Sequence, residues 1–287
     1  MRGIEVSGAG GTTILEGTTR NQSAIVMTGK GSKLHDLKFF FPATTRSGND
    51  YSSQVLVKDA DTFEVYNLFI DGSDSVGVFM SDAHNGVVRH NYIRDTLADS
   101  IHITNKSSHI VVHDNTTFRS GDDSVSVVSY LKDGIKSGNV EIYNNAVIDS
   151  IGHRGLTVVG GEHVQMHDNY VRCTPGHGGI YIASEKTYDI LSTSDVVLRN
   201  NVVQSCSNNN YGAIMVFTSN KPVDHVLVEK NTVLDSPLFS IWVHGEDITD
   251  ITLKDNVILR PQNKAISVNS LPSSTTLSDN VILPTPK

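Results

Sequence analysis

A short hydrophobic segment that ends in asparagine returns at a nearly fixed interval along the chain. Two examples are Val112-His113-Asp114-Asn115 and Met166-His167-Asp168-Asn169. Successive asparagines of this series are separated by 24, 24, 30, 24, 32, 30, 25 and 24 residues. A base period of 24 with occasional insertions predicts a solenoid, in which each repeat forms one coil. The series comprises Asn67, Asn91, Asn115, Asn145, Asn169, Asn201, Asn231, Asn256 and Asn280, and Asp36 opens it.

A second strand pattern follows each asparagine after 9 to 12 residues, as in Ser100-Ile101-His102-Ile103 and Gly179-Ile180-Tyr181-Ile182. The chain lacks a sustained helical stripe and has 23 glycines, a composition that suggests short strands joined by tight turns. The even spread of strands excludes an ordinary βαβ fold, and the period is too short for a propeller. We therefore predict an all-β, single-domain parallel β-helix over residues 1–287, with about ten coils of two or three strands.

The repeated asparagine has a physical role in this fold. Asparagine tolerates the left-handed backbone conformation that a sharp turn demands. Its side-chain amides can also hydrogen-bond from coil to coil when they are stacked. We interpret the asparagine series as structural.

Aligning the coils separates the second strand into an inward and an outward column. We expect the inward column to form the core, and its members are Ile101, Val125, Leu156, Ile180, Ile214, Ile241 and Ile266. The outward column contains Phe79, His102, Ser126, Thr157, Tyr181, Met215, Trp242 and Ser267. An exposed stripe of this kind predicts an elongated binding face, although β-propensity alone would also place aromatic residues there. His102, Tyr181 and Trp242 are the substrate-binding candidates on it.

Charged residues gather at the entry to this strand in four successive coils. The residue pairs are Ala98-Asp99, Asp122-Asp123, His153-Arg154 and His177-Gly178. Stacking would place three carboxylates, two imidazoles and one guanidinium within roughly 15 Å of one another. Like charges in adjacent layers repel, so their accumulation here indicates function, although each aspartate alone is also a common turn residue.

Paired carboxyl groups suit the hydrolysis of glycosidic bonds. An inverting enzyme needs one protonated carboxyl group on the leaving oxygen and one carboxylate that activates water. Crowding of Asp99, Asp122 and Asp123 would keep one of them available as an acid. These three residues are the catalytic candidates, with His153, Arg154 and His177 as substrate-binding candidates.

The order Asp99, Gly121-Asp122-Asp123 and Gly152-His153 resembles the catalytic motifs of family 28 polygalacturonases. It is also similar to the related β-helix dextranases and family 87 α-1,3-glucanases. The resemblance implies a right-handed, pectin-lyase-like β-helix and an endo-acting, inverting hydrolase that needs no cofactor or metal. It further implies that Asp122 is the general acid, that Asp99 and Asp123 activate water, and that His153 supports the acid or the substrate.

The sequence departs from the polygalacturonase pattern at the place of its Arg-Ile-Lys motif, where Gly179-Ile180-Tyr181 stands. In polygalacturonases that motif binds a uronate carboxylate. Its absence makes a neutral α-glucan as strong an expectation as polygalacturonate, although Arg154 could still bind a charged sugar. Two rival hypotheses stay open. One is a polysaccharide lyase or uronan epimerase whose aspartates hold Ca²⁺, and the other is a non-catalytic, tailspike-like glycan-binding β-helix.

Composition bounds the partners and the location. The net charge is −8 without a cluster of basic residues, which argues against a nucleic-acid partner. No apolar run approaches the roughly 20 residues of a membrane helix.

The two cysteines, Cys173 and Cys206, exclude a four-cysteine zinc site; we expect a free buried pair, with a disulfide as the alternative. The first residues lack a signal-peptide pattern, and the resemblance nevertheless implies an extracellular or cell-surface enzyme. The oligomeric state and the sugar stay open.

Overall fold

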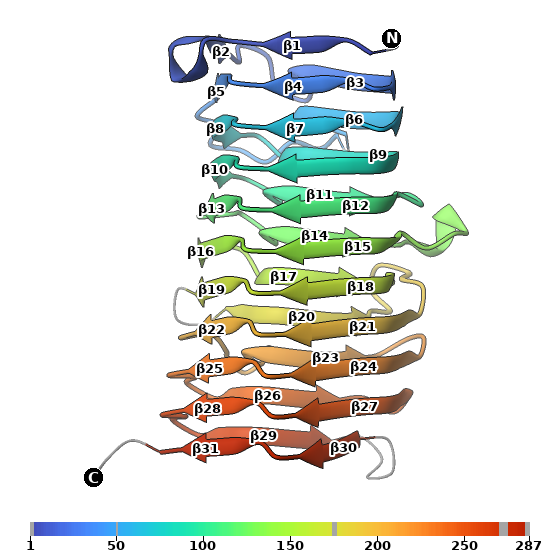
Figure 1. Cartoon of the computed structure of the whole chain (residues 1–287), viewed down its shortest axis with the longest axis vertical. Helices are drawn as coiled ribbons and strands as arrows, with labels where there is room; N and C mark the ends of the chain where they lie inside the picture. Colours follow the sequence, from blue (N-terminus) through green and yellow to red (C-terminus); the bar gives the residue numbers. More distant parts are fainter. Residues whose placement is uncertain (1–2, 50, 174–176, 270–274, 285–287) are drawn as a thin grey trace.

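The chain winds into a stack of coils in which successive turns pair through parallel strands (Figure 1). The computed structural model describes residues 3–49, 51–173, 177–269 and 275–284. The third strand of each coil forms a sheet of 11 strands, so the described residues make eleven coils, close to the predicted ten. Among these residues, no helix has the length and apolar character needed to cross a membrane.

Each complete coil has three strands, and the second and third follow the first in the same order throughout. The first strands are β3 (Ile25–Lys30), β6 (Ser53–Asp61), β9 (Val76–Arg89), β11 (Ile101–Thr104), β14 (Val125–Val128), β17 (Arg154–Val159), β20 (Gly178–Ser184), β23 (Ile214–Thr218), β26 (Phe239–His244) and β29 (Lys264–Asn269). The second strands are β1 (Glu5–Ser7), β4 (Lys33–His35), β7 (Glu64–Tyr66), the end of β9, β12 (Ser108–His113), β15 (Gly138–Tyr143), β18 (Glu162–His167), β21 (Thr193–Arg199), β24 (Val223–Glu229), β27 (Ile248–Lys254) and β30 (Thr275–Ser278).

The third strands are short and complete each coil. They are β2 (Ile14–Glu16), β5 (Lys38–Phe40), β8 (Phe69–Ser73), β10 (Tyr92–Thr96), β13 (Thr116–Phe118), β16 (Ala146–Ser150), β19 (Tyr170–Cys173), β22 (Val202–Gln204), β25 (Thr232–Leu234), β28 (Val257–Leu259) and β31 (Val281–Leu283). Two single 3-10 turns, η1 (Gly10–Thr12) and η2 (Leu131–Asp133), are the helical elements of the described residues.

The predicted inward column forms the core. Ile101 pairs with Val125, Val125 with Leu156, and Leu156 with Ile180, each in register with the next coil. All four side chains are fully buried. Alternation of side chains along each strand therefore fixes the register, because a slip by one residue would turn this column to the outside.

The asparagine series forms a hydrogen-bonded ladder inside the stack. The backbone N–H and the side-chain Nδ2 of Asn145 both donate to Oδ1 of Asn169, each at 3.0 Å. Nδ2 of Asn169 donates to Oδ1 of Asn201 at 3.0 Å and to the Ile142 carbonyl at 2.9 Å. The same pattern runs from Asn91 to Asn280. The structural interpretation of these asparagines agrees with this arrangement.

Two details of that interpretation were wrong. The left-handed residue of each turn is the one before the ladder asparagine, as at Asp114 (φ 54°) and Asp168 (φ 55°). Asn67 belongs to that left-handed column (φ 51°), and Leu68 occupies the ladder position, where its N–H donates to Asn91. The ladder asparagines thus serve as buried hydrogen-bonding groups, while the turn geometry depends on their neighbours.

We expect Asn169→Ala to lower the free energy of unfolding by about 3 kcal/mol, because each buried polar group left unpaired costs roughly 1–3 kcal/mol. The matched control is Asn280→Ala at the last described rung, which is only half-buried and has ladder contacts on one side. Its loss should be less than half as large. Urea unfolding of both variants measures the difference, and equal losses would contradict the structural role of the inner rungs.

The predicted exposed stripe is largely covered. Phe79 is 7% exposed and Tyr181 is 3% exposed, although both point outward from the coil. Phe79 packs with Leu56, Val76 and Ala98, while Tyr181 belongs to a second small cluster that includes Ile190 of a long loop. The column faces outward as predicted, but residues of neighbouring coils cover Phe79 and a loop residue covers Tyr181, contacts that strand alternation does not predict.

Cys173 and Cys206 form a disulfide between neighbouring coils, with their Cα atoms 5.0 Å apart. The expectation of a free pair was wrong, and the alternative holds. The placement in equivalent positions of adjacent coils explains the bond, because stacked Cα atoms lie within the separation that a disulfide bridges.

Candidate active site

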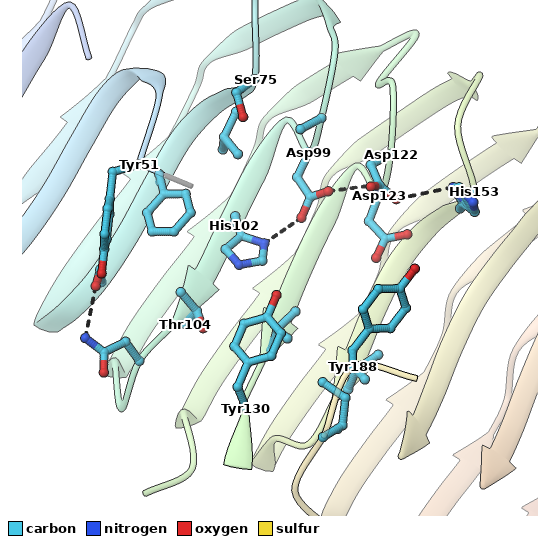
Figure 2. Close-up of a pocket in the computed structure, with 18 of the residues that line it drawn as sticks. Tyr51, Ser75, Asp99, His102, Thr104, Asp122, Asp123, Tyr130, His153 and Tyr188 are labelled. Carbon is cyan, nitrogen blue, oxygen red and sulfur yellow. Dashed lines mark hydrogen bonds and ion pairs between the residues drawn. The ribbon is translucent and has the colours of Figure 1, made fainter. Parts of the chain in front are cut away.

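A cleft of about 770 Å³ lies over the outward face of the first strands, where loops rise on its sides. Its floor comes from β9, β11, β14 and β17. Residues 46–49 and Tyr51 contribute one wall, and the loops that carry Tyr130 and Tyr188 contribute another. Figure 2 shows the three aspartates facing the same space as the rings of Tyr130 and Tyr188.

The coil register brings the predicted carboxylates together. Arg154 pairs with Gly178 along the stack, and the Ser100 and Ser124 amides donate to the carbonyls of Asp123 and Arg154 in the next coils. As a result, one oxygen from each of Asp99, Asp122 and Asp123 lies within 4.8 Å of the others. The stacking predicted from the repeat is thus present in the structure.

Two glycines allow the turns that carry these aspartates to approach closely. A Cβ atom on Gly121 would lie 2.7 Å from the Thr96 carbonyl oxygen and from the Leu97 backbone. A Cβ atom on Gly152 would lie 2.1 Å from the Gly121 carbonyl oxygen. Both distances are too short for any side chain, so glycine precedes Asp122 and His153 for steric reasons.

Asp99 is almost completely buried and strongly hydrogen-bonded. Its Oδ2 accepts hydrogen bonds from the Ser126 hydroxyl at 2.5 Å and from Nδ1 of His102 at 2.6 Å. Its Oδ1 accepts the backbone N–H of Asp123 at 3.1 Å. Three polar groups thus hold this carboxyl group in a fixed position.

Asp123 forms a buried, two-point ion pair with Arg154. Nε and Nη2 of Arg154 donate to the two carboxylate oxygens at 2.8 and 3.1 Å, and Nη1 donates to Glu185 at 3.2 Å. The guanidinium also lies 4.6 Å from the ring centre of Tyr181. Burial alone would lower the pKa of Arg154, but the charge and hydrogen bonds of Asp123, with Glu185, hold that pKa well above its ordinary value.

Asp122 is the most accessible carboxyl group of the three, with 22% of its side chain exposed. Its Oδ2 accepts a hydrogen bond from Nη1 of Arg46 at 3.0 Å. Its Oδ1 lies 3.3 Å from Nδ1 of His153, whose side chain is half-exposed. Both partners are more exposed than Arg154, since each has more than half of its side chain in solvent.

The remaining substrate-binding candidates lie outside the cleft lining. His177 is partly buried beside the site, and this burial, with nearby His153, lowers its pKa. Tyr181 is buried and donates its hydroxyl to Glu185 at 2.9 Å. Trp242 stacks on Phe239 and on His244, and its indole N–H donates to Asn269. Any contact of Tyr181 with a sugar would thus be indirect, and the Trp242 ring packs against side chains of its own strand.

Several residues of the site were missed in the sequence. Arg46 and Tyr51 come from the segment between β5 and β6, and Glu185 follows β20. The interval of 31 residues from Asp36 to Asn67, which exceeds the base period, was the one signal for an insertion there. Glu185 lies within the long interval of 32 residues between Asn169 and Asn201, but the repeat pattern does not predict that its side chain contacts Arg154.

This arrangement can perform acid and base chemistry on a bound molecule. An accessible carboxyl group lies beside two buried ones, of which one is hydrogen-bonded to Ser126 and the other is paired with the guanidinium of Arg154. The same three groups have oxygens close enough to hold a cation, as the lyase hypothesis requires. The residue types fit oxygen-ligand chemistry, so the choice between the two depends on the surrounding partners.

The comparisons with known proteins agree with this geometry. Residues 75–207 match the family model described as α-1,3-glucanase catalytic domain D2, a segment that contains Asp99, Asp122 and Asp123. Residues 1–133 match the model described as right-handed β-helix region. The chain has the right-handed β-helix fold. No curated protein matches the sequence.

Solved structures extend the likeness of this β-helix over the whole chain. The catalytic domain of a GH87 α-1,3-glucanase in complex with tetrasaccharides superposes with a TM-score of 0.77 at 17% identity, covering 100% of this chain and 58% of that one. The catalytic unit of the thermostable GH87 α-1,3-glucanase from Streptomyces thermodiastaticus gives 0.68 at 17% identity, covering 97% and 61%. An exopolygalacturonase from Thermotoga maritima gives 0.65 at 13% identity, covering 88% and 71%. The predicted resemblance to β-helix glycoside hydrolases is therefore confirmed, and this β-helix spans less than two thirds of the glucanase domains.

Proposed function

We propose that this β-helix hydrolyses the glycosidic bonds of a neutral, α-linked polysaccharide, with α-1,3-glucan as the first candidate. One observation carries the proposal: three carboxyl groups with different partners converge at the floor of a cleft. Their segment matches the α-1,3-glucanase catalytic domain model. A structural or purely binding β-helix has no need for buried like charges, which are costly to maintain.

Asp122 acts as the general acid in this proposal, and Asp99 and Asp123 activate the attacking water. Their different partners support these roles. Asp123 and Asp99 are buried and have fixed hydrogen-bonding partners, whereas Asp122 is the one that a substrate entering the cleft reaches. Two oxygens that lie within 4.8 Å of each other can accept both hydrogens of one water molecule, since each hydrogen bond spans about 2.8 Å.

We expect inversion at the anomeric carbon. The oxygen separation in the cluster is shorter than the roughly 6.5–9.5 Å common between the two carboxyl groups of inverting enzymes. However, Asp99 and Asp123 are buried and held in place by their partners, whereas a covalent nucleophile must reach the anomeric carbon itself. Proton NMR of the first product anomer decides between the two outcomes: a β-anomer from an α-linked substrate supports inversion.

The partners of the cleft arginines support a neutral sugar. Among the described residues that line the cleft, Arg46 is paired with Asp122, and Arg154 is paired with Asp123 and Glu185. A uronate would have to compete with these carboxylates for a guanidinium. We therefore expect activity on α-1,3-glucan and little on polygalacturonate.

The lyase alternative has one favourable observation, the close approach of three carboxyl oxygens that could hold Ca²⁺. It also needs a base that removes a proton from the sugar. Arg154 does not suit that role, because its two carboxylate partners hold its pKa well above the ordinary value and keep it charged. A histidine of the cleft would have to supply the base instead, and the match of residues 75–207 to the α-1,3-glucanase catalytic domain model makes the hydrolase the preferred function.

A glycan screen tests the proposal directly. Soluble and insoluble α-glucans, polygalacturonate and alginate are incubated with the protein, and both reducing ends and ultraviolet absorbance are measured. We expect new reducing ends from α-1,3-glucan, no unsaturated product, and no loss of activity with a chelator. Unsaturated products that disappear with the chelator would favour the lyase, and no product from any glycan would favour a non-catalytic module.

Two further parts of the proposal concern mode of action and location. The floor of the cleft crosses four neighbouring coils, from β9 to β17, and its lining residues include Tyr51 at one end and Tyr211 at the other. This length supports endo-cleavage, which a time course of product sizes would show as early intermediate fragments. The disulfide supports an oxidising compartment and hence an extracellular or cell-surface location.

A further inference from the structure

His102 has two ring nitrogens in different surroundings. Nδ1 lies 2.6 Å from Oδ2 of Asp99 and 2.8 Å from the Ser126 hydroxyl. Nε2 has no hydrogen-bond partner among the described residues, and the side chain lines the cleft. Figure 2 shows the Nδ1 side of the ring facing Asp99 while the rest of the ring is turned away from it.

The partners of Nδ1 determine which nitrogen carries the proton. An ionised carboxylate only accepts hydrogen bonds, and the Ser126 hydroxyl already donates to the same Asp99 oxygen. Nδ1 must therefore be the protonated nitrogen that donates to Asp99. In the neutral imidazole, Nε2 then presents a lone pair to the cleft.

The ring is held rigidly in this orientation. Phe79 stacks on His102 with ring centres 5.0 Å apart and an interplanar angle of 29°. His102 itself is 8% exposed, so the ring has little freedom to turn. A fixed acceptor at the floor of a cleft is suited to recognise a hydroxyl group at a defined position.

We propose that His102 has two separable roles: Nδ1–H positions the Asp99 carboxylate, and Nε2 accepts a hydrogen bond from a hydroxyl group of the sugar bound in the cleft. The first role acts through Asp99 and governs turnover. The second acts on the substrate and governs affinity. This inference rests on the proposed hydrolase function, because both roles refer to the same substrate.

Two substitutions separate the roles. His102→Asn places an amide N–H where Nδ1–H donates to Asp99 but removes the acceptor in the cleft. His102→Gln extends an amide to the region of Nε2 but removes the short donor to Asp99. Ser126→Ala is the matched control for the first role, because Ser126 is fully buried, donates to Asp99 and does not line the cleft.

Affinity is measured with α-1,3-linked glucotetraose by calorimetry in the Asp122→Asn background, so that turnover does not obscure binding. We expect His102→Asn to weaken binding about 3- to 10-fold, the effect of one lost hydrogen bond, and Ser126→Ala to leave it unchanged. With Asp122 intact, His102→Gln and Ser126→Ala should lower kcat about 10- to 100-fold, because each removes a hydrogen bond to a charged group. His102→Asn should retain kcat within about threefold.

Unchanged affinity in His102→Asn would overturn the sugar-reading role, and unchanged kcat in His102→Gln would overturn the positioning role. Thermal unfolding of each variant separates these results from misfolding. Failure of the proposed function is recognised independently, since it appears as full activity of Asp122→Asn or as no activity of the unsubstituted chain on α-1,3-glucan.

Discussion

Asp122→Asn should abolish hydrolysis while the substrate still binds. The amide has nearly the same shape as the carboxyl group and keeps contact with Arg46 and His153, but it has no proton to give to the leaving oxygen. Removal of a general acid typically costs 10²–10⁴-fold in rate, so we expect kcat to fall by about 10³-fold. The measurement compares reducing-end release with calorimetric binding of α-1,3-linked glucotetraose.

The matched control is Asp235→Asn. Asp235 is also paired with an arginine, Arg260, at 2.7 Å. It follows β25 of the 11-stranded sheet and does not line the cleft. Its substitution should leave kcat unchanged. Retained turnover in Asp122→Asn would remove Asp122 from the role of acid, and loss of binding together with activity would assign it to substrate recognition instead.

Arg154→Met should cause the largest loss of stability among single substitutions in the cleft. It leaves the Asp123 carboxylate, 3% exposed, without its two-point partner, and Glu185 loses the same guanidinium. Removing one partner of a buried ion pair costs about 3–5 kcal/mol, because the remaining charge stays desolvated. Denaturant unfolding monitored by circular dichroism measures the difference.

An exposed pair of the same type provides the control. Arg172 donates to Asp149 at 2.8 Å, and 43% of its side chain is exposed, so Arg172→Met should cost no more than about 1 kcal/mol. The double substitution Asp123→Leu with Arg154→Met should regain most of the stability without regaining activity. If the double variant were as unstable as Arg154→Met, packing rather than the unpaired charge would explain the loss.

Much of the fold was predictable because the repeat itself contains the register. Once Asn115, Asn145 and Asn169 are aligned, alternation decides which residues face inward, and parallel pairing places Asp99, Asp123 and Arg154 in neighbouring coils. The carboxylate cluster was therefore predictable before any coordinates. Asn67 was assigned to the wrong column because its coil has a leucine, Leu68, at the ladder position.

The walls of the cleft were not predictable in the same way. Arg46 reaches Asp122 across 76 residues, from a loop that has no repeated pattern. That loop is fixed by contacts such as the one from Arg20 to the Thr45 carbonyl, which depend on the final fold. The burial of Phe79 and Tyr181 also depends on contacts that exist only in the final fold. The repeat therefore predicts which residues of adjacent coils pair. The contacts of the inserted loops form only in the folded stack, and the repeat does not predict them.

The asparagine ladder also determines where the molecule opens. Each inner rung has a neighbour above and below, while a rung at the end of the series has only one. Local opening should thus begin at the ends of the stack, and amide hydrogens there should exchange with solvent faster than those near Asn145. Asp122 and Asp123 lie between the rungs Asn115 and Asn145, and Asp99 lies one coil earlier, between Asn91 and Asn115. Fraying at either end can proceed without disturbing the distances between these carboxyl groups, which gives the reacting atoms the most rigid surroundings the solenoid offers.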